Sequence, residues 1–273
     1  SSTRCAAWAT SWKIRAGPRD PQGIARRRLR NRAAASILRP VNPSPAAPAP
    51  AAPSPPDYGA LPLFPLELVL YPGGVLPLRI FELRYLDMVG RCHREGRPFG
   101  IVALSAGREV AQPAGPQEGG FAPEAFHFTG TLARIEQLSN PQPGLLEIWC
   151  RGEGRFRLHT VRRERNGLWV GMGEPLPQDP PMAVPSDLET LAYSLKAVLD
   201  RIDSEVRKQD ATAESPPHHL DDCGWVANRW AELLPLELEA KQRLLEIDSP
   251  LLRLELAADW LDRLQREAKR SGS

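Results

Sequence analysis

The chain has 273 residues, of which 42% are hydrophobic and 25% are charged, so it can bury the cores of one or two domains. No apolar run approaches the roughly 20 residues that a membrane-spanning helix needs. The net charge of +2 is unevenly distributed, because residues 1–56 sum to about +9 and residues 57–273 to about −7. This acidic balance argues against a nucleic-acid-binding surface on the folded part, since such surfaces neutralise phosphates with Lys and Arg.

Residues 1–58 are predicted to be a disordered basic arm followed by a stiff linker. Eight of the 17 residues from 40 to 56 are proline, and most of the others are alanine or serine, so this stretch has no apolar stripe to bury. The Arg-rich, acid-poor start is also typical of an organellar transit peptide, although Gly and Pro between residues 17 and 23 would interrupt its amphipathic helix. A cytoplasmic protein is the expectation, with an organellar location as the alternative.

Two strands and a helix with one buried side are predicted for residues 61–95. Pro62 and Pro65 lack the N–H that a central strand donates, so the first strand is expected to lie at a sheet edge or to begin irregularly. A Tyr-Pro-Gly-Gly turn at residues 71–74 then reverses the chain into a return strand. The apolar residues expected to face inward at helical spacing are Phe81, Tyr85, Met88 and Val89. The residues expected to point outward are Glu82, Arg84, Asp87 and Arg91.

The sequence PLFPLELVLYPGGVLPLRIFELRY, residues 62–85, resembles the opening signature of the Lon N-terminal domain family. Further matching elements are FGIV at 99–102, GTLARI at 130–135 and RGEGRFR at 151–157. The resemblance covers about residues 60–265. It implies a PUA-like β-barrel followed by a helical domain, which the Lon protease uses to engage substrate polypeptide and to support assembly. The expected fold class is therefore α+β, in a stand-alone protein of this type.

The barrel is expected over residues 59–180, built from six or seven short strands. Residues 106–125 are rich in Gly, Pro, Gln and Glu and are predicted to form a long loop. The apolar alternation of the next strand shifts after Gly130, which predicts a bulge there. Asn166-Gly167 is a strong hairpin signal, whereas Gly152-Glu153-Gly154 is interpreted as a turn.

Helices are predicted over residues 181–268, where the apolar period changes to about 3.6. Ser186 and Glu189 suggest a capping box at the start of the first helix. Asp221 or Asp222 is expected to cap the second helix, and Ser249-Pro250 to begin the fourth. The residues expected to face inward from that fourth helix are Leu252, Leu256, Trp260 and Leu264.

No catalytic, cofactor or metal site is predicted. The chain has no Gly-Lys dipeptide, which a phosphate-binding loop requires, and Ser194 and Lys196 would point away from each other on a helix. A cluster of residues at 218–223, with two His, two Asp and one Cys, is better explained by helix capping than by zinc binding. The four cysteines form no C-x-x-C pair, so buried, reduced thiols are expected.

Trp149 and Trp169 are the candidate peptide-binding residues, because strand alternation places both on the face opposite the apolar core. Half-exposed tryptophans can hold unfolded polypeptide, but both could instead pack under the helices. The sequence thus predicts a non-catalytic polypeptide-binding or adaptor protein, alone or with a separate ATP-dependent protease. A nucleic-acid-binding module, using the barrel or the basic arm, is the alternative.

Overall fold

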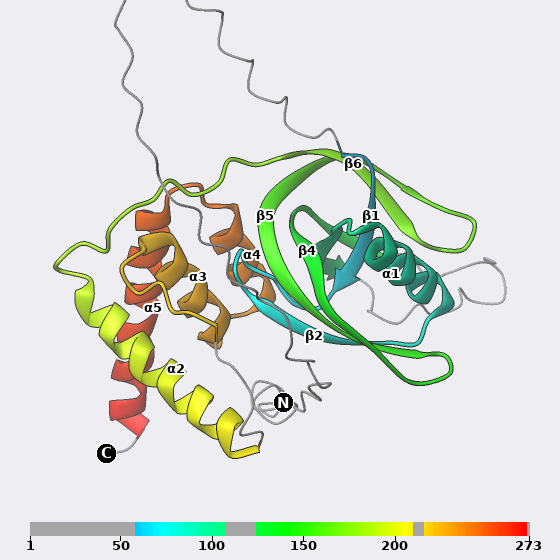
Figure 1. The fold of residues 1–273 in the computed structure, drawn as a ribbon. Helices are drawn as coiled ribbons and strands as arrows, with labels where there is room; N and C mark the ends of the chain where they lie inside the picture. Colours follow the sequence, from blue (N-terminus) through cyan, green and yellow to red (C-terminus); the bar gives the residue numbers. More distant parts are fainter. Residues whose placement is uncertain (1–57, 107–123, 210–215, 272–273) are drawn as a thin grey trace, which may run out of the picture.

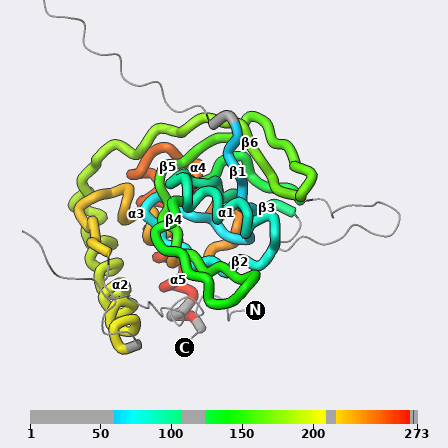
Figure 2. The backbone as a smooth tube through the Cα atoms, turned by 45° about the vertical axis from the view of Figure 1, so that its right-hand side comes forward, coloured from blue at the N-terminus to red at the C-terminus, as the bar shows by residue number. Residues whose placement is uncertain are grey.

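The computed structural model describes residues 58–106, 124–209 and 216–271. The expected basic arm and most of the expected loop at 106–125 lie outside the described residues. Figures 1 and 2 show a ring of strands that carries α1, with α2, α3 and α5 gathered to one side of it. The fold is therefore mixed α+β, as predicted. None of the described helices is both long and apolar enough to cross a bilayer.

Five strands close into a ring in the order β5-β4-β3-β1-β6, and β6 pairs back onto β5. Among the residues that the structure describes, the sixth strand, β2, pairs with β5 alone, so it lies at an edge of the sheet. The strands are β1 Tyr58–Leu66, β2 Val75–Ile80, β3 Phe99–Ala106, β4 Ala125–Gln142, β5 Leu145–Arg163 and β6 Trp169–Pro175. Two of them, β4 and β5, have 18 and 19 residues, so the expectation of uniformly short strands is wrong.

Register shifts bend the two long strands around the ring. The β4–β5 register shifts between Thr131 and Ala133, next to the bulge predicted near Gly130. An added Cβ at Gly130 would come within 2.3 Å of the Ile101 carbonyl oxygen, so a glycine is needed at this close approach. The Asn166-Gly167 turn joins β5 to β6 as predicted, with a positive φ of 86° at Gly167.

The first strand begins irregularly, which is one of its two expected features, because the β1–β6 register shifts between Tyr58 and Leu61. The other expectation, a position at the sheet edge, is wrong. β1 lies between β3 and β6, with Pro65 opposite Val102 and Pro62 opposite Val170. A closed ring has no edge at this position, and each proline removes only one N–H from a ladder that keeps its other bonds. The predicted turn forms, with Gly74 N donating to Tyr71 O at 2.9 Å. However, it leads into β2, which pairs with β5 and not with β1.

Helix α1, Leu83–Glu95, packs its inner face on the ring. Tyr85, Met88 and Val89 are buried as predicted, and the Tyr85 ring stacks on Phe64 at a centroid distance of 3.9 Å. Phe81 precedes the helix and is 58% exposed, so its predicted inward position is wrong. Arg84, predicted to point outward, is buried, because its Nη1 donates to the Gly167 carbonyl at 2.9 Å.

The C-terminal helices form a second core. They are α2 Glu189–Gln209, α3 Cys223–Leu233, α4 Leu238–Glu246 and α5 Pro250–Ser271. Asp222 caps α3 as predicted, since its side chain accepts from Trp225 N at 2.7 Å. The turn at 186–188 precedes α2, so Ser186 lies outside the helix. On α5 the expected inward stripe is partly wrong, because Leu252 is 46% exposed while Arg253 is fully buried.

Helix α4 connects the helical core to the ring. Gln242 is buried and donates to the Thr129 carbonyl of β4 at 3.0 Å. Tyr71 precedes β2, and its hydroxyl donates to the Lys241 carbonyl at 2.6 Å. Burial of this phenol raises the pKa of Tyr71 well above its ordinary value, so it remains a donor at any physiological pH. These contacts fix the seam between ring and helices, where the cavities described next lie.

Candidate functional site

A cavity of about 830 Å³ lies where the ring meets the helices. One wall is residues 153–155 of β5, a second is the connection 175–179 that follows β6, and a third is the first turn of α3. This volume falls within the range of about 300–1,000 Å³ that is usual for ligand sites. We call this space the first seam cavity.

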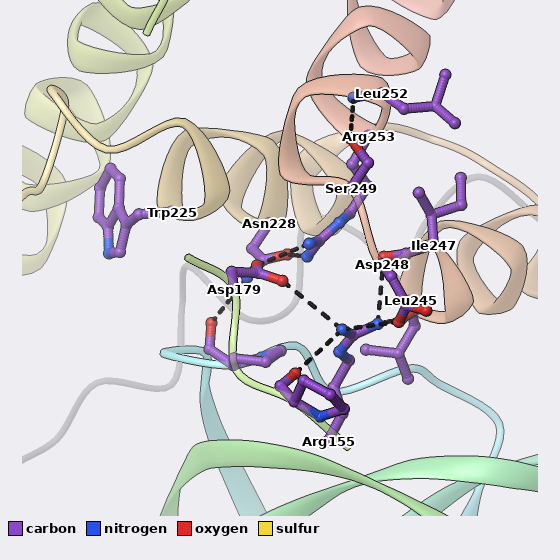
Figure 3. A network of polar contacts seen from close by, with 12 residues as sticks. Arg155, Asp179, Trp225, Asn228, Leu245, Ile247, Asp248, Ser249, Leu252 and Arg253 are labelled. Atoms are coloured by element: carbon purple, nitrogen blue, oxygen red, sulfur yellow. Dashed lines mark hydrogen bonds and ion pairs between the residues drawn. The ribbon is translucent and has the colours of Figure 1, made fainter. Parts of the chain in front are cut away.

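Arg155 of β5 fixes the barrel wall of the first seam cavity (Figure 3). It is 4% exposed, and its Nη1 donates to the carbonyls of Leu245 at 2.9 Å and Ile247 at 3.2 Å. Its Nη2 lies 3.2 Å from Asp248 Oδ1 and 3.7 Å from Asp179 Oδ1. A buried guanidinium is stable only when it is paired in this way, so Arg155 holds the end of α4 against β5.

Arg253 of α5 holds the opposite wall. Its side chain is fully buried, its Nη1 donates to Asn228 Oδ1 and its Nη2 donates to Asp179 Oδ2 at 2.6 Å. Asp179 therefore lies between two guanidinium groups, one from the barrel and one from the helices (Figure 3). The network ties the 175–179 connection to both parts, which makes the cavity wall rigid.

A second cavity of about 490 Å³ adjoins the first. Its apolar lining includes Leu199 and Ile202 of α2 and Leu233 of α3, together with Pro216 and Pro217. Gly73 and Trp225 line both cavities, so the two spaces are neighbours on either side of these residues. We refer to the two together as the seam groove.

Trp225 is the central aromatic residue of the seam groove. Its ring lies 5.8 Å from the His218 ring, 6.0 Å from the His219 ring and 5.8 Å from the Arg229 guanidinium. It is half-buried, which leaves part of a large apolar surface in the groove. Local sequence patterns do not single out Trp225, because the turn that brings Gly73 to the same ring is 152 positions away.

Glu232 is the unusual acid at the floor of the second cavity. Its Oε1 accepts from Arg229 Nη2 at 2.8 Å, and the same nitrogen donates to the Pro72 carbonyl at 3.0 Å. Burial raises the pKa of Glu232 to about 6, even though the Arg229 and Lys241 charges act to lower it. The Glu232–Arg229 pair thus joins α3 to the Pro-Gly-Gly turn of the barrel.

This raised pKa makes the stability depend on pH. The folded state holds the Glu232 proton more tightly than the unfolded chain does, so Glu232 stabilises the fold below about pH 4.5 and loses that contribution as the pH rises through about 6. We expect the free energy of unfolding of the wild type, relative to Glu232→Gln, to fall by about 2 kcal/mol from about pH 4.5 to about pH 7. Urea unfolding of the wild type and of Glu232→Gln at several pH values measures this difference. A difference that stays constant or rises with pH would contradict this prediction.

The two tryptophans predicted from the sequence lie far apart along β5: Trp149 is near the start of β5, and Trp169 of β6 pairs with the end of β5. Trp149 is in the first part of that strand, opposite Pro77 of β2, and is half-buried. Trp169 begins β6 opposite Arg163, and its Nε1 donates to Glu124 Oε2 at 2.7 Å. The Trp169 ring also meets the Phe126 ring edge-on at 5.3 Å. The fold therefore does not bring Trp149 and Trp169 together, and neither lines the seam groove.

The residue pairs considered for catalysis are separated. Ser194 Oγ donates to the Thr190 carbonyl at 2.7 Å, whereas Lys196 Nζ binds Asp200 at 2.6 Å. Among the described residues no group of three or more His, Cys, Asp or Glu is placed to hold a metal ion.

Burial raises the pKa of the Cys150 thiol to about 12 and that of the Cys223 thiol to about 11, so both are poor nucleophiles at neutral pH. The interpretation of Gly152-Glu153-Gly154 as a turn is wrong, since all three residues lie within β5.

Residues 60–263 match the family described as the ATP-dependent protease La (LON) substrate-binding domain. The chain belongs to this family. The resemblance found in the sequence motifs at residues 62–85 is therefore confirmed. Membership also accounts for the mixed fold, in which a ring of strands is followed by C-terminal helices.

Several proteins are similar to this LON substrate-binding domain. The Lon N-terminal domain protein of Xanthomonas campestris, known from its crystal structure, is 33% identical, with a TM-score of 0.55 over 74% of this chain and 98% of that chain. The Lon protease of Xanthomonas oryzae pv. oryzae is 27% identical over 208 residues, and cereblon of Danio rerio is 24% identical over 254 residues. The match covers 76% of this chain but 23% of that Lon protease, and 74% of this chain but 56% of cereblon.

Proposed function

We propose that this chain binds unfolded or exposed polypeptide segments without catalysing a reaction, and that the seam groove is a site of binding. Membership of the substrate-binding family carries the proposal. The groove supports it, because it combines a half-buried tryptophan with apolar side chains from α2 and α3. Large aromatic side chains bury much area at little entropic cost, which suits binding of varied sequences.

An adaptor role, in which bound polypeptide is delivered to a separate ATP-dependent protease, is the finer form of this proposal. Its support is that the homologous region makes up 23% of the Lon protease of Xanthomonas oryzae pv. oryzae. The separated Ser194 and Lys196 are also consistent with binding that is not coupled to hydrolysis. Purified protein is expected to cleave neither casein nor ATP, and activity that copurifies with the chain would contradict this.

Binding can be tested with fluorescein-labelled casein, an unfolded polypeptide, by fluorescence polarisation. We expect Trp225→Ala to weaken binding by about 1 to 2 kcal/mol, which is the usual cost of removing a contributing aromatic anchor. Casein should also protect His219, which lines the groove, from diethylpyrocarbonate, as read by mass spectrometry. His159 is the matched control, because it is 55% exposed on β5 and does not line the groove. Equal modification of both histidines would remove the groove as the site.

Trp149 and Trp169 remain further proposed contacts, and their surroundings separate the expected results. Trp169→Ala should lower the free energy of unfolding by about 2 kcal/mol, because it removes a half-buried ring packed on Phe126 and the hydrogen bond to Glu124. Trp149→Ala should weaken casein binding by about 1 kcal/mol if its half-buried ring contacts polypeptide. Thermal unfolding and polarisation on both variants measure these effects. An unchanged affinity in a folded Trp149 variant would exclude that residue.

A further inference from the structure

Strand β2 leaves one of its edges unoccupied. It pairs with β5 alone, and in the described part of the chain no other segment makes a backbone hydrogen bond to residues 75–79. An open edge presents N–H and C=O groups that can pair with another strand. Natural proteins protect most such edges with charge, proline or a covering segment.

The hydrogen-bond pattern shows which residues face outward. Gly152 N donates to Gly74 O at 2.8 Å, so this pair is of the hydrogen-bonded type, and the type alternates along an antiparallel ladder. The backbone groups of Leu76, Leu78 and Ile80 therefore point to β5. Those of Val75, Pro77 and Arg79 point away from it, so the missing N–H of Pro77 costs no bond to β5.

A mainly apolar hollow, whose lining also includes Arg79 and Glu82, lies beside this edge. Its volume is about 190 Å³, and its lining includes Phe64 and Leu66 of β1, Leu78 of β2 and Tyr85 of α1. This is smaller than the ligand sites of about 300–1,000 Å³ found in proteins, so it suits a single apolar side chain. Phe81 also lines the hollow and is 58% exposed. Leu83, close by in the chain, is 79% exposed.

We propose that an extended polypeptide segment adds as a strand to the outer edge of β2 and places one apolar side chain in this hollow. The proposal rests on the proposed polypeptide binding and adds a second contact with a defined chemistry. Side chains on one face of an added strand lie on the same side of the sheet as Leu78, which faces the hollow. Main-chain bonds to residues 75–79 are independent of the bound sequence, so the edge selects extended, unfolded segments.

Pro77 and Arg79 alone would fit an ordinary protected edge, because proline and charge discourage pairing. That explanation leaves the exposed Phe81 and the apolar hollow without a role. The Arg79 side chain forms an ion pair with Glu147 of β5, with its Nε 3.2 Å from Glu147 Oε1. The backbone acceptors of residues 75, 77 and 79 remain available to an incoming strand.

Backbone methylation of a probe tests strand addition directly. The probe is a short fluorescein-labelled peptide with a central leucine flanked by threonines, and two versions carry N-methyl groups on alternate residues of opposite parity. A strand bonds through one parity only, so one version should lose at least about tenfold in affinity, and the other should bind like the parent. Equal affinities of the two versions would overturn the proposal.

Two matched phenylalanine variants locate the site. Phe81→Ser should lower the affinity for the parent peptide at least about fivefold, a modest effect for an exposed aromatic contact. Phe128→Ser is the control, because Phe128 is 47% exposed on β4 and does not line the hollow. Equal affinity of the two variants would overturn the edge site. If Trp225→Ala still weakens casein binding in that case, the proposed polypeptide binding stands without the β2 edge site. If Phe81→Ser abolishes self-association and peptide binding is absent, the occupant is a second copy and the inference is wrong.

Discussion

Arg253→Met is expected to lower the free energy of unfolding by about 3 to 5 kcal/mol. Arg253 is fully buried and donates to Asn228 and Asp179, so its loss leaves a carboxylate with one fewer cation in a desolvated site. Breaking a buried pair from one side costs this much because the remaining charge stays buried. Urea unfolding at neutral pH measures the change. A loss below about 1 kcal/mol would show that water or a rearranged Arg155 takes the place of Arg253.

Two comparisons separate the charge effect from lost packing. Lys196→Met removes an ion pair with Asp200 in which both side chains are about half exposed, and we expect no measurable change in stability. Adding Asp179→Asn to Arg253→Met should recover part of the lost stability, because the uncompensated carboxylate is gone. If the double variant is as unstable as the single one, then the loss arises from packing and not from charge.

Local patterns in the sequence predicted several helix boundaries and turns correctly, although the turn expected at residues 152–154 is part of β5. Asp222 caps α3, Pro250 begins α5 and Asn166-Gly167 turns β5 into β6, because each of these features is determined by residues within a few positions. Errors arose where the partner is distant in the chain. Arg84 was expected to point outward and Leu252 inward, but it is Arg84 and Arg253 that are buried, against carbonyl and carboxylate groups from other elements.

The candidate site was less accessible to sequence reasoning than the fold. Trp149 and Trp169 stood out because strand alternation places them outside the core, but alternation does not show that they lie at opposite ends of β5. The seam groove instead combines a turn, a connection and two helices, none of which carries a binding motif of its own. Its central Trp225 has an ordinary helical position, so only the packing of α3 against the Pro-Gly-Gly turn identifies it.

Gly152→Ala is expected to lower the free energy of unfolding by about 3 kcal/mol, the upper part of the usual range for overpacking. A Cβ at this position would lie 2.2 Å from the Tyr71 carbonyl oxygen, which is part of the backbone and cannot rotate away. The strand cannot move aside easily, because Gly152 N donates to Gly74 O and Gly73 N donates to Gly152 O, both at 2.8 Å. Thermal and urea unfolding measure the loss.

Gly154→Ala is the matched control within the same Gly-Glu-Gly sequence. An added Cβ at Gly154 meets no atom within 4 Å, and the φ angle of Gly154 is not positive, so this change should be neutral or stabilise by up to about 1 kcal/mol. Equal stability of the two variants would contradict the close approach of β5 to the Tyr71 turn.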